Sequence, residues 1–141
     1  MNENILFLVM TGSTMEERRF NIDNTWGKDI DLIYYSDHEE QNVIKVTFGS
    51  DYRFVELKQI NIINKFPENL IQKYNWFFFA DDDTFVNTNL LRNNLKNFEP
   101  EFVYGREGIY KMVDSNLNYL SGGAGFLMHK NILLKLKSKL T

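Results

Sequence analysis

The chain has 141 residues, a length that fits one domain. Its 43% hydrophobic content suffices for a core, and its net charge of −3 gives no general affinity for nucleic acid. The absence of cysteine excludes disulfides and zinc–thiolate sites. No apolar run approaches the roughly 20 residues that cross a bilayer, and no signal peptide is visible because the run 5–10 is short and follows Glu3. We therefore expect a soluble globular domain, or a piece of one.

The amino-terminal third of the chain predicts two strands around a helix. Residues 5–10 are a continuous apolar run, which is typical of a buried strand. Ser13 with Glu16 fits a capping box ahead of a helix over 15–26, for which Gly27 is the expected C-cap. Residues 30–35 predict a second strand.

Strands and helices are expected to alternate along the rest of the chain. The expected elements, in order, are a strand over 43–48, a helix over 54–65, a short helix after Pro67, a strand over 76–80, a helix over 89–98, strands over 102–105 and 109–113, a strand after a glycine-rich turn at 121–125, and a helix over 131–140. This alternation predicts an α/β fold with a mostly parallel, Rossmann-like sheet flanked by helices, in a single domain over residues 1–141.

Three carboxylates, Asp81, Asp82 and Asp83, directly follow the apolar run 76–80. Open α/β sheets place their ligands at this end of their strands. Adjacent negative charges repel one another and raise their own pKa values unless a cation compensates them, and a hard divalent cation with oxygen ligands would do so. The alternative is that the triplet only caps the following helix, although Asn87 or Thr88 could do this from a closer position, or that it is only a solvated acidic loop.

Two reaction classes are compatible with an Asp-any-Asp pattern after a buried strand. Phosphatases of the haloacid dehalogenase type need a Thr four residues after the first Asp, but this chain has Phe85 there, and the motif comes late in the sequence. In metal-dependent nucleotide-sugar transferases, the carboxylates hold a cation that grips a diphosphate and neutralises the leaving group. The pattern favours the second class.

A glycine-rich segment, Ser121-Gly122-Gly123-Ala124-Gly125, precedes the last predicted strand. Glycines allow positive φ and a close approach of the backbone to a ligand. A tight turn or bulge that only leads into the strand is an equally good explanation of this segment taken alone.

Together these segments resemble the Fringe-like β1,3-glycosyltransferases, the group that includes Fringe and the core 1 β1,3-galactosyltransferase. The resemblance covers nearly the whole chain. It rests on Arg18-Arg19, Thr25-Trp26, the run from Trp76 to Val86 with its three aspartates, Tyr104-Gly105 and the run from Tyr119 to Phe126 with its glycines, in that order. Trp26 and Trp76 are expected to be core residues rather than ligand contacts, because an aromatic side chain buries much area.

The resemblance implies a GT-A fold, a UDP-sugar donor, manganese, and transfer with inversion to a glycan or glycoprotein hydroxyl in a β1,3 linkage. By motif position it makes Asp83 the main metal ligand, with Asp81 as the second. Asp81 and Asp82 would assist the metal or hydrogen-bond the ribose and sugar of the donor. The remaining donor contacts implied are Thr11 near the uridine, Arg19 at the nucleotide, and Gly122 and Gly123 along the donor sugar. An exposed helix charge is the alternative for Arg19.

The chain departs from the family after the glycine segment. In the family, a carboxylate downstream acts as general base, and a histidine further on completes the metal site. Residues 126–141 hold no Asp or Glu, and His129, expected to be a surface residue at a helix start, is too close to the glycines to match. The catalytic base therefore stays unassigned. The expectation is an amino-terminal part of a longer enzyme or a reduced homologue, with a non-catalytic UDP-sugar-binding or interaction module as the alternative function.

Overall fold

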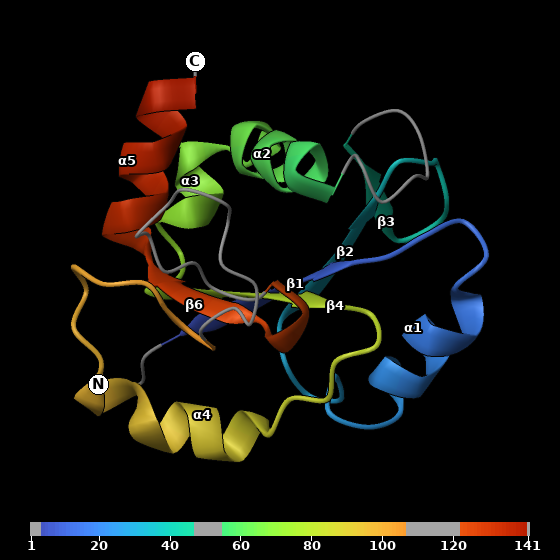
Figure 1. The fold of residues 1–141 in the computed structure, drawn as a ribbon, viewed down its shortest axis with the longest axis horizontal. Coiled ribbons are helices and arrows are strands. Elements are labelled where there is room, and N and C mark those ends of the chain that lie inside the picture. Colours follow the sequence, from blue (N-terminus) through green and yellow to red (C-terminus); the bar gives the residue numbers. More distant parts are fainter. Residues whose placement is uncertain (1–3, 47–54, 107–121, 141) are drawn as a thin grey trace, which may run out of the picture.

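A computed structural model describes residues 4–46, 55–106 and 122–140. In these residues, one sheet contains six strands in the order β3-β2-β1-β4-β6-β5 and carries helices on both faces (Figure 1). The strands are β1 (Ile5–Met10), β2 (Leu32–Ser36), β3 (Val43–Lys45), β4 (Trp76–Asp81), β5 (Tyr104–Gly105) and β6 (Phe126–His129). The helices are α1 (Glu16–Asp23), α2 (Val55–Lys65), α3 (Glu68–Ile71), α4 (Thr88–Asn94) and α5 (Lys130–Leu140), with 3₁₀ turns η2 (Leu95–Asn97) and η3 (Gly122–Ala124).

The sheet is mixed, and its parallel part holds the first four strands. β1 pairs in parallel with both β2 and β4, and β3 continues the parallel part beside β2. β6 runs antiparallel to β4, and β5 runs antiparallel to β6. The predicted α/β class with a mostly parallel sheet is thus confirmed. Because β6 is antiparallel, its first residue lies at the same edge of the sheet as the last residues of β1 and β4.

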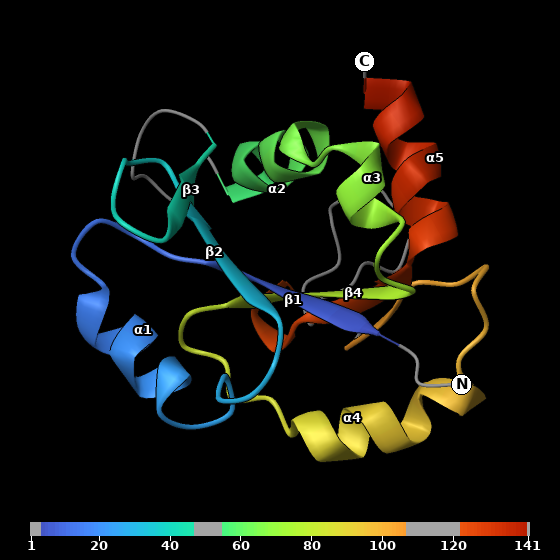
Figure 2. The same cartoon turned by 180° about the vertical axis from the view of Figure 1, so that it is seen from behind.

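Strand β1 is buried on both faces, as its uninterrupted apolar sequence predicts. Alternate residues of a strand point to opposite faces. Leu6 and Leu8 accordingly join a core with residues of α2, α3 and α5, whereas Ile5, Phe7 and Val9 join a second core with residues of α1 and η2. Figure 2 shows the same division, with α2, α3 and α5 on one face of the sheet and α1 and α4 on the other.

The two tryptophans are core residues, as expected. Trp26 is 7% exposed and Trp76 is 2% exposed. The ring of Trp76 packs edge-on against His129, with ring centroids 5.0 Å apart. His129 ends β6 directly before α5, and its Nδ1 accepts a hydrogen bond from the Asn131 N–H at 3.3 Å. Its expected place at a helix start is confirmed, but the residue is half-buried against an aromatic ring rather than at the surface.

The predicted ends of helix α1 are corrected by the structure. The N-cap is Met15, no side chain caps the helix, and the expected capping box of Ser13 and Glu16 does not form. The helix ends at Asp23 with Asn24 as C-cap, so it is shorter than the predicted 15–26. Gly27 is not the C-cap, but its N–H donates to the Ile22 carbonyl at 2.8 Å, which closes the turns that follow the helix.

Other predicted elements exist with modest shifts of their ends. The second strand begins at Leu32 rather than residue 30, and the predicted helix over 89–98 becomes α4 followed by η2. The strand predicted over 102–105 is limited to Tyr104–Gly105. The candidate strand over 109–113, residues 47–48 and 54, and Ser121 lie outside the described residues.

Candidate functional site

The candidate site lies where the strand order of the sheet reverses. The chain goes from β1 outward to β2 and β3, then returns to place β4 on the other side of β1. Such a switch point leaves a crevice at the carboxyl ends of the two strands, where α/β proteins bind ligands. The register pairs Met10 with Asp81, so Thr11 and the acidic triplet both come directly after this point.

The three carboxylates of the triplet have different environments. Asp81 is the last residue of β4 and is half-buried, Asp82 is 9% exposed, and Asp83 is exposed. The pKa of Asp81 is raised to about 6, first by burial and then by the negative charges of Asp83 and Asp82. The repulsion predicted from the sequence is therefore present at Asp81.

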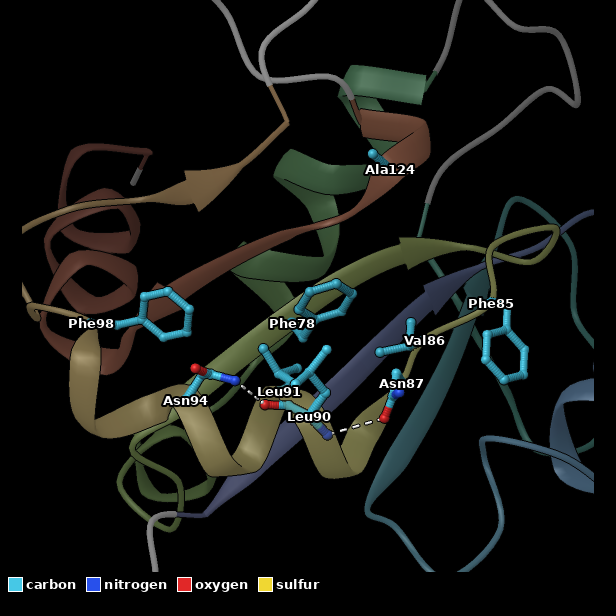
Figure 3. Close-up of a pocket in the computed structure, with 9 residues that line it drawn as sticks. All are labelled: Phe78, Phe85, Val86, Asn87, Leu90, Leu91, Asn94, Phe98 and Ala124. Atoms are coloured by element: carbon cyan, nitrogen blue, oxygen red, sulfur yellow. Dashed lines mark hydrogen bonds between the residues drawn. The ribbon is translucent and has the colours of Figure 1, made fainter.

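Helix capping does not explain the triplet. The N-cap of α4 is Asn87, whose side-chain oxygen accepts a hydrogen bond from the Leu90 N–H at 3.0 Å (Figure 3). The side-chain cap of this helix is thus supplied by Asn87, four residues after Asp83. The capping interpretation of the three carboxylates is wrong.

The glycine segment lies against the acidic triplet, although the two are far apart in sequence. The Thr84 hydroxyl donates to the Gly123 carbonyl at 2.7 Å. A Cβ atom on Gly123 would lie 3.9 Å from Asp81 Oδ2. Gly122 opens the same turn, η3, which contacts β4. The two motifs that carried the resemblance therefore meet at one edge of the sheet.

Gly125 has a structural requirement of its own. Its φ is +81°, and a Cβ atom there would lie 2.6 Å from Cζ of Phe78. Only glycine fits this position without strain or displacement. The turn into β6 is thus sufficient to explain why residue 125 is glycine. Gly123 differs, because it faces the carboxylate of Asp81.

Thr11 and Arg19 are both buried, at 4% and 7% exposure. Arg19 Nη1 donates to Thr11 Oγ1 and to the Gly12 carbonyl, each at 3.1 Å, and Nη2 contacts Glu40 Oε1 at 2.5 Å. The alternative that Arg19 is an exposed helix charge is wrong. Its guanidinium lies at the carboxyl end of β1, beside the predicted nucleotide position.

Sequence reasoning gave no role to three residues that line this edge. Arg18 Nη1 pairs with Asp82 Oδ1 at 3.0 Å. Glu40 Oε2 lies 2.8 Å from His38 Nε2, and the hydrogen bond with His38 lowers the pKa of Glu40, with Arg19 adding to the effect. In the sequence, Arg18 is noted as part of the Arg18-Arg19 pair. Which way its side chain points depends on how α1 packs on the sheet, which the sequence does not show. Glu40 and His38 lie in a polar loop whose sequence has no periodic signal.

Among the described residues, no three histidine or acidic side chains converge into a self-sufficient metal site. Asp81 and Asp83 offer oxygen ligands of the kind that hard divalent cations prefer. Such cations often bind through one or two carboxylates together with substrate phosphates and water. The chemistry of these two residues fits that mode.

An apolar pocket of about 360 Å³ lies on the α4 side of the sheet (Figure 3). Its walls include Phe78 of β4, Leu91 of α4 and Ala124 of η3. Phe85, two residues after Asp83, is 75% exposed at its rim. Through η3, the pocket shares a wall with the candidate site.

These features define an α/β protein with a ligand site at the switch point of its sheet and carboxylates at that site. The family model described as Fringe-like matches residues 1–140, and the chain belongs to this family. Its mixed sheet with flanking helices is a GT-A-like arrangement. In the described parts of the chain, no helix is long and apolar enough to span a membrane.

Two curated relatives are similar to the chain at low identity. A beta-1,3-glucosyltransferase of Mus musculus is 29% identical over 121 residues, which cover 82% of this chain and 24% of that protein. A glycoprotein-N-acetylgalactosamine 3-beta-galactosyltransferase 1 of Xenopus laevis is 24% identical over 136 residues, which cover 93% of this chain and 37% of that protein. The chain thus spans less than two fifths of either relative.

Proposed function

We propose that this chain forms the donor-binding part of a hexosyltransferase that moves a sugar from a UDP-sugar to a glycan or glycoprotein hydroxyl. The reaction is metal-dependent and inverting, and it makes a β1,3 linkage. The Fringe-like family and the two relatives named as β1,3-transferases support the reaction class. The single observation that carries the proposal is the meeting of Asp81 with Gly123 at the switch point of the sheet.

Asp83 and Asp81 are the residues that would hold the cation, with manganese as the expected metal. Asp83 is exposed just after β4, and the pKa of Asp81 is raised first by burial and then by the negative charges of Asp83 and Asp82. When bound, the cation supplies neutralisation of the charge that develops on the diphosphate leaving group. The protein's own task is to keep the two carboxylates at the end of a rigid strand.

The backbone at Gly123 supports binding of the donor sugar. Since its missing side chain leaves space 3.9 Å from Asp81 Oδ2, a ligand can approach both the backbone and the carboxylate there. Thr11 and Arg19 lie at the end of β1, the strand next to β4, where the nucleoside of the donor is expected. Gly122 begins the same turn and belongs to the same proposed surface.

The test is calorimetric titration of UDP into the full chain with and without Mn²⁺. We expect UDP binding to need Mn²⁺ and to be lost in Asp83→Asn. The matched control is Asp29→Asn, the same chemical change at an exposed residue just before β2, at the opposite edge of the sheet. Metal-independent UDP binding, or binding that Asp83→Asn leaves intact, contradicts the proposal.

A second measurement separates transfer from binding alone. Release of UDP from a panel of UDP-hexoses is followed with and without glycan acceptors. Acceptor-dependent release supports the transferase, whereas Mn²⁺-dependent UDP binding without any release identifies a donor-binding module.

A further inference from the structure

The middle carboxylate of the triplet is held by the protein itself. Asp82 Oδ1 accepts a hydrogen bond from Arg18 Nη1 at 3.0 Å, and Oδ2 accepts one from the Thr11 hydroxyl at 2.8 Å. The Asp82 side chain is 8% exposed. Each oxygen of this carboxylate therefore already has a donor, from α1 and from the residue after β1.

The direction of the Thr11 hydrogen bond is fixed by its other partner. Arg19 Nη1 can only donate, so the Thr11 oxygen must accept that bond. The single proton of the hydroxyl is then left for Asp82. Arg19 is itself held by the Gly12 carbonyl and by Glu40. A directional chain of hydrogen bonds thus runs from α1 through the end of β1 to the end of β4.

The neighbours of Asp82 have a different arrangement. Asp81 lies against Gly123, and Asp83 is exposed. For Asp82 to bind a cation, it would have to leave Arg18 and Thr11, which would leave a partly buried guanidinium and a buried hydroxyl without this acceptor. The anchored middle residue instead fixes the turn that carries the other two carboxylates.

We propose that Asp82 is a positioning residue, clamped by Arg18 and Thr11, which orients Asp81 and Asp83 toward the cation without binding it. This inference rests on the proposed function and deepens it. It reassigns Asp82 from the metal or donor contact that the family resemblance implied to a role that acts through its two neighbours.

The first experiment compares Mn²⁺ binding to the full chain, with Mn²⁺ alone and with UDP as probes, in Asp82→Asn and Asp83→Asn. Folding of each variant is checked by circular dichroism. Loss of a residue that orients metal ligands typically weakens metal affinity by about 10- to 100-fold. We expect Asp82→Asn to weaken Mn²⁺ binding within this range, and Asp83→Asn to abolish it.

The electron paramagnetic resonance spectrum of bound Mn²⁺ distinguishes positioning from ligation. At saturating Mn²⁺ and UDP, the Asp82→Asn spectrum should match that of the wild type, because the ligand set is unchanged. An altered spectrum in Asp82→Asn, or a loss of binding equal to that in Asp83→Asn, makes Asp82 a ligand and overturns the inference. If the wild type itself binds no Mn²⁺ and UDP, the proposed function fails, and this inference fails with it.

A double-mutant cycle tests whether Arg18 acts through Asp82. If Arg18 acts only through Asp82, the double variant Arg18→Gln/Asp82→Asn should weaken Mn²⁺ binding no more than Asp82→Asn alone. Additive losses would show that Arg18 acts independently of Asp82, which overturns the clamp. Thr11→Ser should retain wild-type affinity and Thr11→Val should not, because only serine keeps the hydroxyl; equal effects of the two variants also contradict the clamp.

Discussion

The Thr84 hydroxyl and the Gly123 carbonyl, 39 residues apart in sequence, form a 2.7 Å hydrogen bond. Thr84 also closes the turn of the triplet, because its N–H donates to the Asp81 carbonyl at 3.2 Å. One residue thus links the turn that carries the carboxylates to the turn that carries the glycines. The relative placement of the two motifs depends on this link as well as on the pairing of β4 with β6.

Replacing Thr84 with valine should loosen this link while keeping the shape of the side chain. The expected cost is about 0.5–1.5 kcal/mol of unfolding free energy, the usual contribution of one hydrogen bond. Urea denaturation measures it. Thr84→Ser keeps the hydroxyl and is the matched control; a loss confined to Thr84→Ser, with Thr84→Val as stable as the wild type, would show that the methyl group, not the hydrogen bond, matters.

The elements best predicted from sequence are those whose apolar patterns favour one kind of secondary structure and one degree of burial. Residues 5–10 and 76–80 are apolar throughout and are too short for a typical helix, so they are best explained as strands buried on both faces. The alternation of elements then makes a parallel sheet, and the carboxyl ends of its strands meet at one edge. This reasoning placed the triplet at the ligand-binding end of the sheet, whereas the place of Thr11 near the donor came only from the family resemblance.

The parts that sequence could not predict depend on tertiary packing. The residues around Arg19 in the sequence are those of an ordinary surface helix. In the fold, its guanidinium is buried at the end of β1 and hydrogen-bonded to Thr11, Gly12 and Glu40. The capping box failed because Ser13 precedes Met15, the residue that takes the N-cap position. In both cases a local signal was overridden by where helix α1 sits on the sheet.

Gly125 should tolerate no side chain. Gly125→Ala would impose a left-handed φ, at about 1–2 kcal/mol, and would press Cβ against the ring of Phe78, at a further 1–3 kcal/mol or so. Chemical denaturation should show a loss of about 2–5 kcal/mol. Gly12→Ala is the control, since Cβ there meets only Met15 Cγ at 3.4 Å; a loss of similar size in both variants would contradict the argument from φ.

The free carboxylate of Asp81 should destabilise the metal-free protein. Its pKa is raised from 3.8 to about 6 in the folded chain. Stability linked to this group is therefore fully present below pH 3.8 and is lost as the pH rises through about 6. Asp81→Asn should thus stabilise the protein in EDTA by about 1–3 kcal/mol at pH 8, with little change at the lowest pH at which both proteins fold.

Thermal unfolding at several pH values, in EDTA and then in Mn²⁺, measures this effect. The gain from Asp81→Asn should shrink or reverse in Mn²⁺, because a cation would compensate the carboxylate. A gain that is the same at every pH would show that Asp81 titrates normally. The variant thus separates the destabilisation that the Asp81 carboxylate causes without metal from its proposed role in binding the cation.

Lys58 and Asp37 form a second buried charge pair, with Nζ and Oδ1 3.5 Å apart and side chains that are each 7% exposed. Burial works to raise the pKa of Asp37, but hydrogen bonds from Ser36 and the backbone and the charge of Lys58 outweigh it and lower the pKa. A depressed carboxyl pKa stabilises the fold above the unfolded value of 3.8. That stability is lost as the pH falls through the folded pKa.

Lys58→Met should cost about 3–5 kcal/mol at pH 7, since it leaves the Asp37 carboxylate buried without its cation. The pKa of Asp37 should rise, so acid unfolding of this variant should depend less on the ionisation of Asp37. Guanidinium denaturation at pH 7 and pH 3.5 measures both effects. The double variant with Asp37→Asn removes the unpaired charge and should recover part of the stability; a double variant less stable than Lys58→Met would show that the Asp37 carboxylate stabilises the fold without the lysine, which contradicts the argument.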